Sequence, residues 1–119
     1  MRQLVIVLIG SLFQALAFGQ SYRHPVLDTL VAHLVGTGTE ENLDHIDRAF
    51  RDAGSDAEPR LAYFLLRYRC EQLYYQGLWD ESMVDAQKAR RIAEVLKDSL
   101  LIASSLNQIS VLLEEHDDD

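Results

Sequence analysis

The sequence predicts an all-α fold of antiparallel helix pairs, with about five helices after a signal peptide. Apolar residues recur at steps of three and four residues along most of the chain beyond residue 25, which is typical of amphipathic helices. Alternating apolar and polar runs, the usual signs of strands, are missing. Small side chains gather along one side of the stretch 77–98, which indicates helices that pack closely.

The first 19 residues have the pattern of a secretory signal peptide. Arg2 supplies the positive start, an almost unbroken apolar run covers residues 4–12, and small residues stand two apart at Ala17 and Gly19. A membrane span needs about 20 apolar residues. The apolar stretch here is shorter and contains Gln14, which favours a cleaved signal over an uncleaved anchor. We predict cleavage after Gly19, with cleavage after Ala17 as the alternative, and a periplasmic or secreted mature protein.

The chain is acidic and has room for one domain, with 119 residues and a formal net charge of -8. Negative charge repels the phosphates of nucleic acids and of anionic lipids. We therefore expect no nucleic-acid partner and, after signal cleavage, no membrane association. Cys70 is the single cysteine and falls within a helical apolar pattern, so we interpret it as a small buried hydrophobe; pairing between chains and a reactive thiol are the alternatives.

Residues 20–57 are predicted to form an N-terminal helix pair, which we interpret as an atypical cap of a repeat array. A first helix is expected at about 26–35, ended by the Gly-Thr-Gly sequence at 36–38. A second is expected near 40–53, with Thr39 as its cap and acidic residues in its first turn.

Residues 58–119 are predicted to hold three longer helices. The third runs over about 58–76 and ends at Gly77, a natural helix stop. The fourth runs over about 80–97 with Asp80 as its cap, and the fifth over about 100–115. The predicted inner stripe of the fifth helix consists of Ile102, Ala103, Leu106, Ile109, Ser110 and Leu113.

Three positions of the third helix recur 40 residues later in the fifth helix, and internal periods of 20 to 50 residues are typical of solenoids. The matched pairs are Leu66 with Leu106, Cys70 with Ser110, and Leu73 with Leu113. The fourth helix adds small residues at Ser82, Ala86 and Ala89.

On these residues, the segment 62–117 resembles the tetratricopeptide repeat family, with one full repeat plus the first helix of a second. The resemblance implies a right-handed solenoid that binds protein segments. The residues that carry it at the packing sites are Leu66, Cys70, Leu73, Gly77, Trp79, Ser82, Ala86, Ala89, Leu106, Ser110 and Leu113. The stretch 92–115, IAEVLKDSLLIASSLNQISVLLEE, also resembles repeats in the exported sensor regions of some bacterial histidine kinases.

In such a solenoid the first helix of each pair lines a concave groove. The predicted groove residues are Phe64, Arg67, Glu71, Tyr74 and Tyr75. Arginine and aromatic residues contribute strongly to binding at interfaces, although the rings here can instead pack against adjoining helices. Arg67 is predicted to be an exposed contact that pairs with a carboxylate of a bound peptide.

A second candidate surface is the end of the fifth helix. Val111 and Leu112 lie off its predicted inner stripe, and no further helix follows them. We interpret them as exposed apolar residues, which points to self-association through the C-terminal helix, to a partner helix, or to a truncated reading frame.

No motif in the sequence favours catalysis or metal binding. The four histidines are not spaced as metal ligands, and the Gly-Thr-Gly sequence lacks the lysine of a phosphate-binding loop. We expect no catalytic residue, cofactor or metal ion. The sequence therefore favours an exported protein-protein interaction module whose partner is a protein or peptide segment; the alternative is a truncated or stand-alone sensory segment of a two-component histidine kinase regulator.

Overall fold

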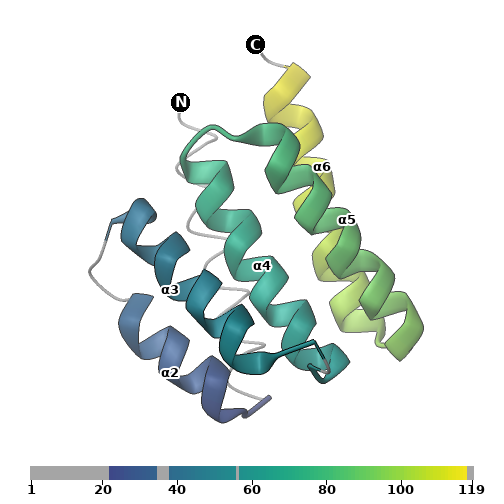
Figure 1. The fold of residues 1–119 in the computed structure, drawn as a ribbon. Helices are drawn as coiled ribbons and strands as arrows, with labels where there is room; N and C mark the ends of the chain where they lie inside the picture. Colours follow the sequence, from purple (N-terminus) through teal and green to yellow (C-terminus); the bar gives the residue numbers. More distant parts are fainter. Residues whose placement is uncertain (1–21, 35–37, 56, 118–119) are drawn as a thin grey trace.

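The structure is a computed structural model, and it describes residues 22–34, 38–55 and 57–117. Five helices make up this part of the chain, which contains no strand, so the prediction of an all-α fold is confirmed there (Figure 1). The helices are α2 (Pro25–Leu34), α3 (Thr39–Ala53), α4 (Pro59–Tyr75), α5 (Trp79–Leu96) and α6 (Ser99–Asp117). The predicted signal peptide lies outside the described residues.

Helix α4 is the centre of the molecule. It packs against α3 and most extensively against α5, while α2 and α6 lie further out, against α3 and α5 respectively (Figure 1). Twelve of its 17 residues are buried, which makes α4 the core element of the fold. Each helix therefore packs against the next one along the chain.

The small side chains on α5 form one continuous contact with α4. Ser82, Ala86 and Ala89 are fully buried, and so is Cys70 on the facing side of α4; we call these four residues the small-residue seam. The Ser82 hydroxyl donates a 2.8 Å hydrogen bond to the carbonyl oxygen of Cys70. A side chain bonded to the backbone of the neighbouring helix requires a close approach, which explains why this side of 77–98 is built from small residues.

A partly buried ion pair flanks the small-residue seam. Arg69 of α4 donates two hydrogen bonds, of 2.8 and 3.0 Å, to the carboxylate of Asp85 on α5. The same guanidinium lies 4.5 Å from the ring centroid of Phe50 on α3. One side chain thus links three helices, and the bidentate geometry fixes how α5 is rotated against α4.

The turn between α4 and α5 depends on Gly77. Its φ of +77° is in the left-handed region that favours glycine, and the following Leu78 N–H donates to the Leu73 carbonyl at 2.9 Å. Helix α5 then begins at Trp79, whose ring packs edge-on against Tyr74 with a centroid separation of 4.9 Å. Leu78 takes the cap position, so the prediction that Asp80 caps this helix is wrong by two positions.

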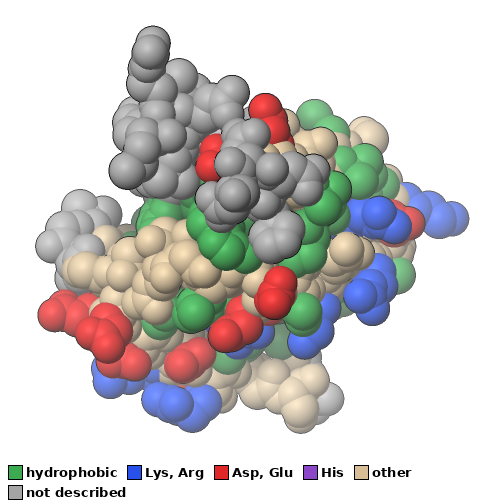
Figure 2. Space-filling view, turned by 90° about the horizontal axis from the view of Figure 1, so that it is seen from above, with side chains coloured by type: hydrophobic (Ala, Val, Ile, Leu, Met, Phe, Trp, Pro, Cys, Tyr) green, Lys and Arg blue, Asp and Glu red, His purple; other side chains and the backbone are tan. Residues whose placement is uncertain are grey.

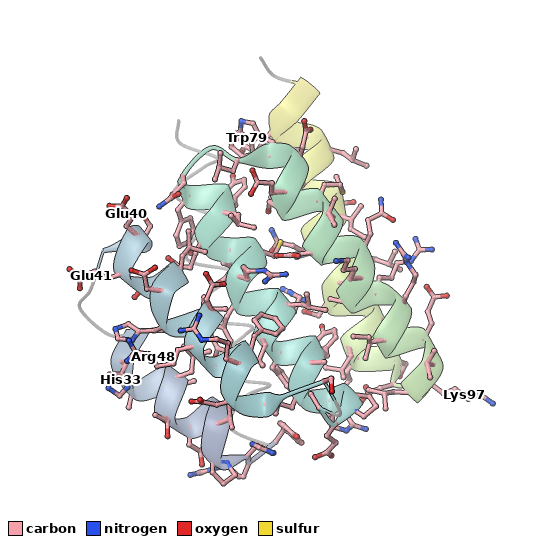
Figure 3. All side chains as sticks on the ribbon, viewed as in Figure 1. His33, Glu40, Glu41, Arg48, Trp79 and Lys97 are labelled. Carbon is pink, nitrogen blue, oxygen red and sulfur yellow. The ribbon has the colours of Figure 1, made fainter. Side chains whose placement is uncertain are left out.

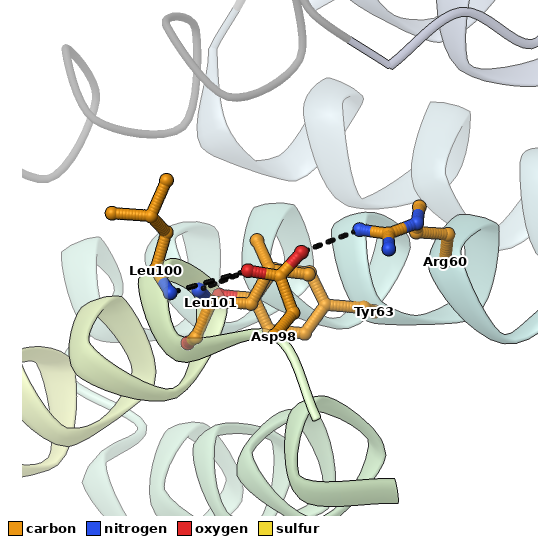
Figure 4. A network of polar contacts seen from close by, with 5 residues as sticks. All are labelled: Arg60, Tyr63, Asp98, Leu100 and Leu101. Atoms are coloured by element: carbon orange, nitrogen blue, oxygen red, sulfur yellow. Dashed lines mark hydrogen bonds and ion pairs between the residues drawn. The ribbon is translucent and has the colours of Figure 1, made fainter. Parts of the chain in front are cut away.

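Helix α6 begins with a polar cap that ties it to α4 (Figure 4). The carboxylate of Asp98 accepts 3.2 Å hydrogen bonds from the backbone N–H groups of Leu100 and Leu101. Arg60 of α4 donates a 2.7 Å hydrogen bond to the same carboxylate and holds the pKa of Asp98 below its usual range. At the other predicted cap, Thr39 is the first residue of α3 and Gly38 takes the cap position.

The predicted inner stripe of α6 is wrong by about one residue. Leu106 and Leu113 are 45% and 53% exposed, and Ser110 is exposed as well. The buried stripe consists of Leu101, Ser104, Ser105, Gln108 and Leu112. A shift of one residue turns a helix by about 100°. Four residues of the predicted stripe, Ala103, Leu106, Ser110 and Leu113, therefore face outward, whereas Ile102 and Ile109 are half-buried and pack against the core.

The prediction of an exposed apolar pair at Val111 and Leu112 is also wrong. Leu112 is buried in a cluster with Cys70, Tyr74 and Ala86, and Val111 is half-buried beside it. Helix α6 does expose apolar residues, but they are not Val111 and Leu112. We call Ala103, Leu106, Ser110 and Leu113, which are all exposed, the α6 outer face.

Acidic and basic side chains both appear on the face shown in Figure 2, with hydrophobic side chains exposed between them. None of the described helices combines the length and the apolar character that a membrane span needs.

Replacing Ala89 by tryptophan tests the small-residue seam. Ala89 is 0% exposed. A large ring there must push α5 away from α4, and we expect the free energy of unfolding to fall by about 3 kcal/mol or more. Urea denaturation of the full chain measures it. The control is Ala103→Trp, because Ala103 is exposed on α6 and should change stability by no more than about 0.5 kcal/mol. Equal losses in the two variants would contradict the close packing.

Candidate binding site on helices α4 and α6

The five predicted groove residues lie on α4, and the structure buries four of them. Phe64, Arg67, Glu71 and Tyr74 are buried, and Tyr75 is half-buried. The predicted exposure of Arg67 is therefore wrong, because its side chain is 2% exposed. A binding role for these residues stays a prediction, and it now concerns a buried polar cluster instead of an open groove.

Arg67 connects α4 to α6. Its Nη1 donates hydrogen bonds to the Ser104 hydroxyl at 2.6 Å and to the Tyr63 hydroxyl at 3.1 Å. The Tyr63 hydroxyl in turn donates to the backbone carbonyl of Leu101 at 3.1 Å. These bonds cross from the central helix to the first two turns of α6, so Arg67 holds the two helices together.

Glu71 lies one turn beyond Arg67 and is 1% exposed. Neither of its carboxylate oxygens has a hydrogen-bond partner, and it forms no ion pair with Arg67. Burial raises the pKa of Glu71 to about 7, and the positive charge of Arg67 opposes this rise only in part. The carboxyl is therefore protonated over a wide pH range in which an exposed glutamate is charged.

Other polar atoms around Glu71 are also buried without partners. They are Nε of Arg67 and the hydroxyls of Tyr68 and Tyr74. Burial raises the pKa of Tyr74 to about 12, with a smaller contribution from the negative charge of Glu115. Unpaired polar groups are rare in protein interiors, because each gives up its hydrogen bonds to water. All the unpaired side-chain atoms found among the described residues belong to α4, so the interior of α4 is the least satisfied part of the described core.

Sequence reasoning missed the α6 half of the cluster. Ser104, Ser105 and Gln108 are buried, and Ser104 and the Leu101 carbonyl are bonded to Arg67 and Tyr63 of α4. The five positions of the buried stripe recur at steps of three and four residues, but three of the five are polar, so a search for apolar periodicity does not find them.

The cysteine and the acidic residues give no sign of other chemistry. Cys70 is buried, its sulfur lies 3.2 Å from the Ser82 hydroxyl, and burial raises its pKa to about 11. A thiol with so high a pKa is a poor nucleophile. Among the described residues, no group of three or more histidine, cysteine or acidic side chains is arranged to hold a metal ion.

Comparison of the chain with protein-family models gave no match, and comparisons with curated proteins and with solved structures gave none either. The resemblance to tetratricopeptide repeats therefore rests on the residues themselves.

Substitution of Glu71 by glutamine tests the buried carboxyl through pH. The folded chain holds the Glu71 proton up to about pH 7, whereas the unfolded chain releases it near 4.5, so wild-type stability falls as pH rises through this window. Glutamine removes this titration. Near pH 4.5 we expect similar stabilities, and at pH 8 the variant should be more stable by up to about 3 kcal/mol.

Urea unfolding of both proteins across pH 4.5 to about 8 measures this difference. The matched control is Glu81→Gln, an exposed position on α5, which should show no such pH-dependent gain. A Glu71→Gln variant whose stability stays parallel to the wild type at all pH values would contradict a buried neutral carboxyl.

Proposed function

We propose that the chain is an exported protein-protein interaction module of the tetratricopeptide type, with no catalytic activity of its own. The α6 outer face is its docking surface and receives a helix of the partner. One observation carries this proposal: α6 repeats the surface of α4, but among the described residues one of its two sides is buried and the other, the α6 outer face, is exposed.

The repeat is visible in burial as well as in sequence. Shifted by 40 residues, the buried stripe of α6 at 101, 104, 105, 108 and 112 corresponds to α4 positions 61, 64, 65, 68 and 72, which are all buried as well. On α4 this side faces the earlier helices, as in the 3.1 Å hydrogen bond from Asn42 of α3 to Gln72. The correspondence supports antiparallel helix pairs stacked as a right-handed solenoid, with α6 following α4 and α5 as α4 follows α2 and α3.

The second side of α4 gives the template for the docking surface. Leu66, Cys70 and Leu73 are buried there, and Cys70 contacts Ser82 of α5. The matching residues of α6 are Leu106, Ser110 and Leu113, which are exposed. Small residues between leucines allow close approach, as they do at the small-residue seam. The partner that fits is therefore a helix with small residues along one side, like α5.

The uncharged character of the α6 outer face supports this partner. Its four residues carry no charge and combine two leucines with alanine and serine. Leu106 and Leu113 are 45% and 53% exposed, so covering them contributes about half of the roughly 1.5–3 kcal/mol that a fully exposed leucine would give, which suits a helix that packs by its apolar side. A second copy of the chain is one source of such a helix.

A labelled peptide of residues 79–97 tests the docking surface, because this segment is the α5 helix that covers the equivalent surface of α4. We expect saturable binding to the full chain by fluorescence anisotropy. Leu106→Glu and Leu113→Glu should each weaken binding at least about tenfold, since each places a charge where a leucine would be buried. Val95→Glu is the control, because Val95 is 78% exposed on α5. A peptide that binds the Leu106→Glu chain as tightly as the wild type would refute the proposal.

Export is tested separately. Expression of the full chain in a Gram-negative host should yield a periplasmic protein whose N-terminal residue is Gln20, as read by intact-mass spectrometry. The apolar run over residues 4–12 and the small residues before Gln20 provide the cleavage signal. Recovery from the cytoplasm with an intact Met1 would refute export.

A further inference from the structure

A small cavity lies between α2 and α3, away from α6. Its volume is about 250 Å³, and Val26, Leu30 and Ala49 are among the apolar residues that line it. Its polar lining includes His33 from α2 and Arg48 from α3, whose side chains lie near one another at this edge of the molecule (Figure 3). We call it the α2–α3 pocket.

Arg48 supplies a positive charge to this pocket. Arg48 is exposed and makes no hydrogen bond or ion pair with any residue that the structure describes. Asp52 stands one turn further along α3 and also lines the pocket, yet the two do not pair. By contrast, Arg60 and Arg69 are each bound to an aspartate. All five N–H donors of Arg48 are therefore available to a ligand.

Two imidazole rings form the adjoining wall. The ring centroids of His33 and His45 are 5.0 Å apart, with a tilt of 40° between the planes. Nδ1 of His33 donates a 2.8 Å hydrogen bond to the backbone carbonyl of Thr29, which fixes the orientation of that ring. His45 is half-buried against it and lies one turn before Arg48 on α3. The wall is thus held in place by the fold.

We propose that the α2–α3 pocket binds a small organic carboxylate, whose charged group meets Arg48 and His45 and whose alkyl part rests on Leu30 and Ala49. The guanidinium fork matches a carboxylate and disfavours a metal cation. The apolar lining favours an alkyl acid over inorganic phosphate. The volume is below the roughly 300–1,000 Å³ of pockets for drug-sized ligands, so the ligand is a short-chain acid. This inference is independent of the docking surface on α6.

The test is an NMR titration of the full chain with sodium butyrate, with sodium chloride at equal ionic strength as reference. We expect saturable shifts of the Leu30 and Ala49 methyl signals. Acetate should bind more weakly than butyrate, by about fourfold for each buried methylene that it lacks. Shifts that do not saturate, or that sodium chloride reproduces, would overturn the proposal.

Two variants, each of which removes one charge, test whether the pocket binds an anion. Arg48→Ala should weaken butyrate binding at least about tenfold, because it removes a charge-assisted hydrogen bond. Arg51→Ala, an exposed arginine on the same helix that does not line the pocket, is the matched control and should change nothing. Asp52→Asn should tighten binding by about two- to threefold by removing a nearby negative charge.

The reverse pattern identifies a cation site. In that case zinc chloride, but not butyrate, shifts the Leu30 and Ala49 methyl signals. Asp52→Asn then weakens zinc binding, and Arg48→Ala leaves it unchanged. This result would show that the pocket takes a metal ion and that the carboxylate proposal is wrong.

Discussion

The close contact between α4 and α5 sets the geometry of the whole helical array. Because the small-residue seam lets Ser82 bond to the backbone of Cys70, the two helices pack along most of their length. The Arg69–Asp85 pair then fixes their rotation. With α3 packed on α4 and α6 on α5, little of α4 can reach water. Every polar residue on α4 must therefore find a partner inside the protein or lose its charge.

Arg67 and Glu71 show both outcomes within one turn. Arg67 finds hydroxyl partners on Tyr63 and Ser104, and this choice draws a polar stripe of α6 inward. The Asp98 cap, held by Arg60, sets where α6 starts. Hydrogen bonds thus decide the rotation of α6, and Leu106 and Leu113 are left on the outside. Glu71 finds no hydrogen-bond partner, and its raised pKa follows from that isolation.

The same logic separates what the sequence predicts from what it does not. The number and approximate bounds of the helices follow from apolar periodicity, and the glycine at position 77 marks its turn because of its backbone freedom. Close packing by Ser82, Ala86 and Ala89 follows from side-chain size alone. The orientation of α6 does not follow, because the partner of Ser104 stands 37 residues earlier in the chain, at Arg67. The spacing of apolar residues within one helix does not predict that a serine is buried when its hydrogen-bond partner lies on another helix. For the same reason Arg67 is predicted as a surface residue, although it is a link between helices.

The two proposed surfaces lie at opposite ends of the array (Figure 1). The α2–α3 pocket is formed by helices that contact α4, and α6 packs on α5, so α4 and α5 stand between the pocket and the α6 outer face. A ligand in the pocket and a helix on α6 therefore do not compete for space. Among the described helices, the contacts that join the two surfaces run through α4, where neither carboxylate oxygen of Glu71 has a hydrogen-bond partner.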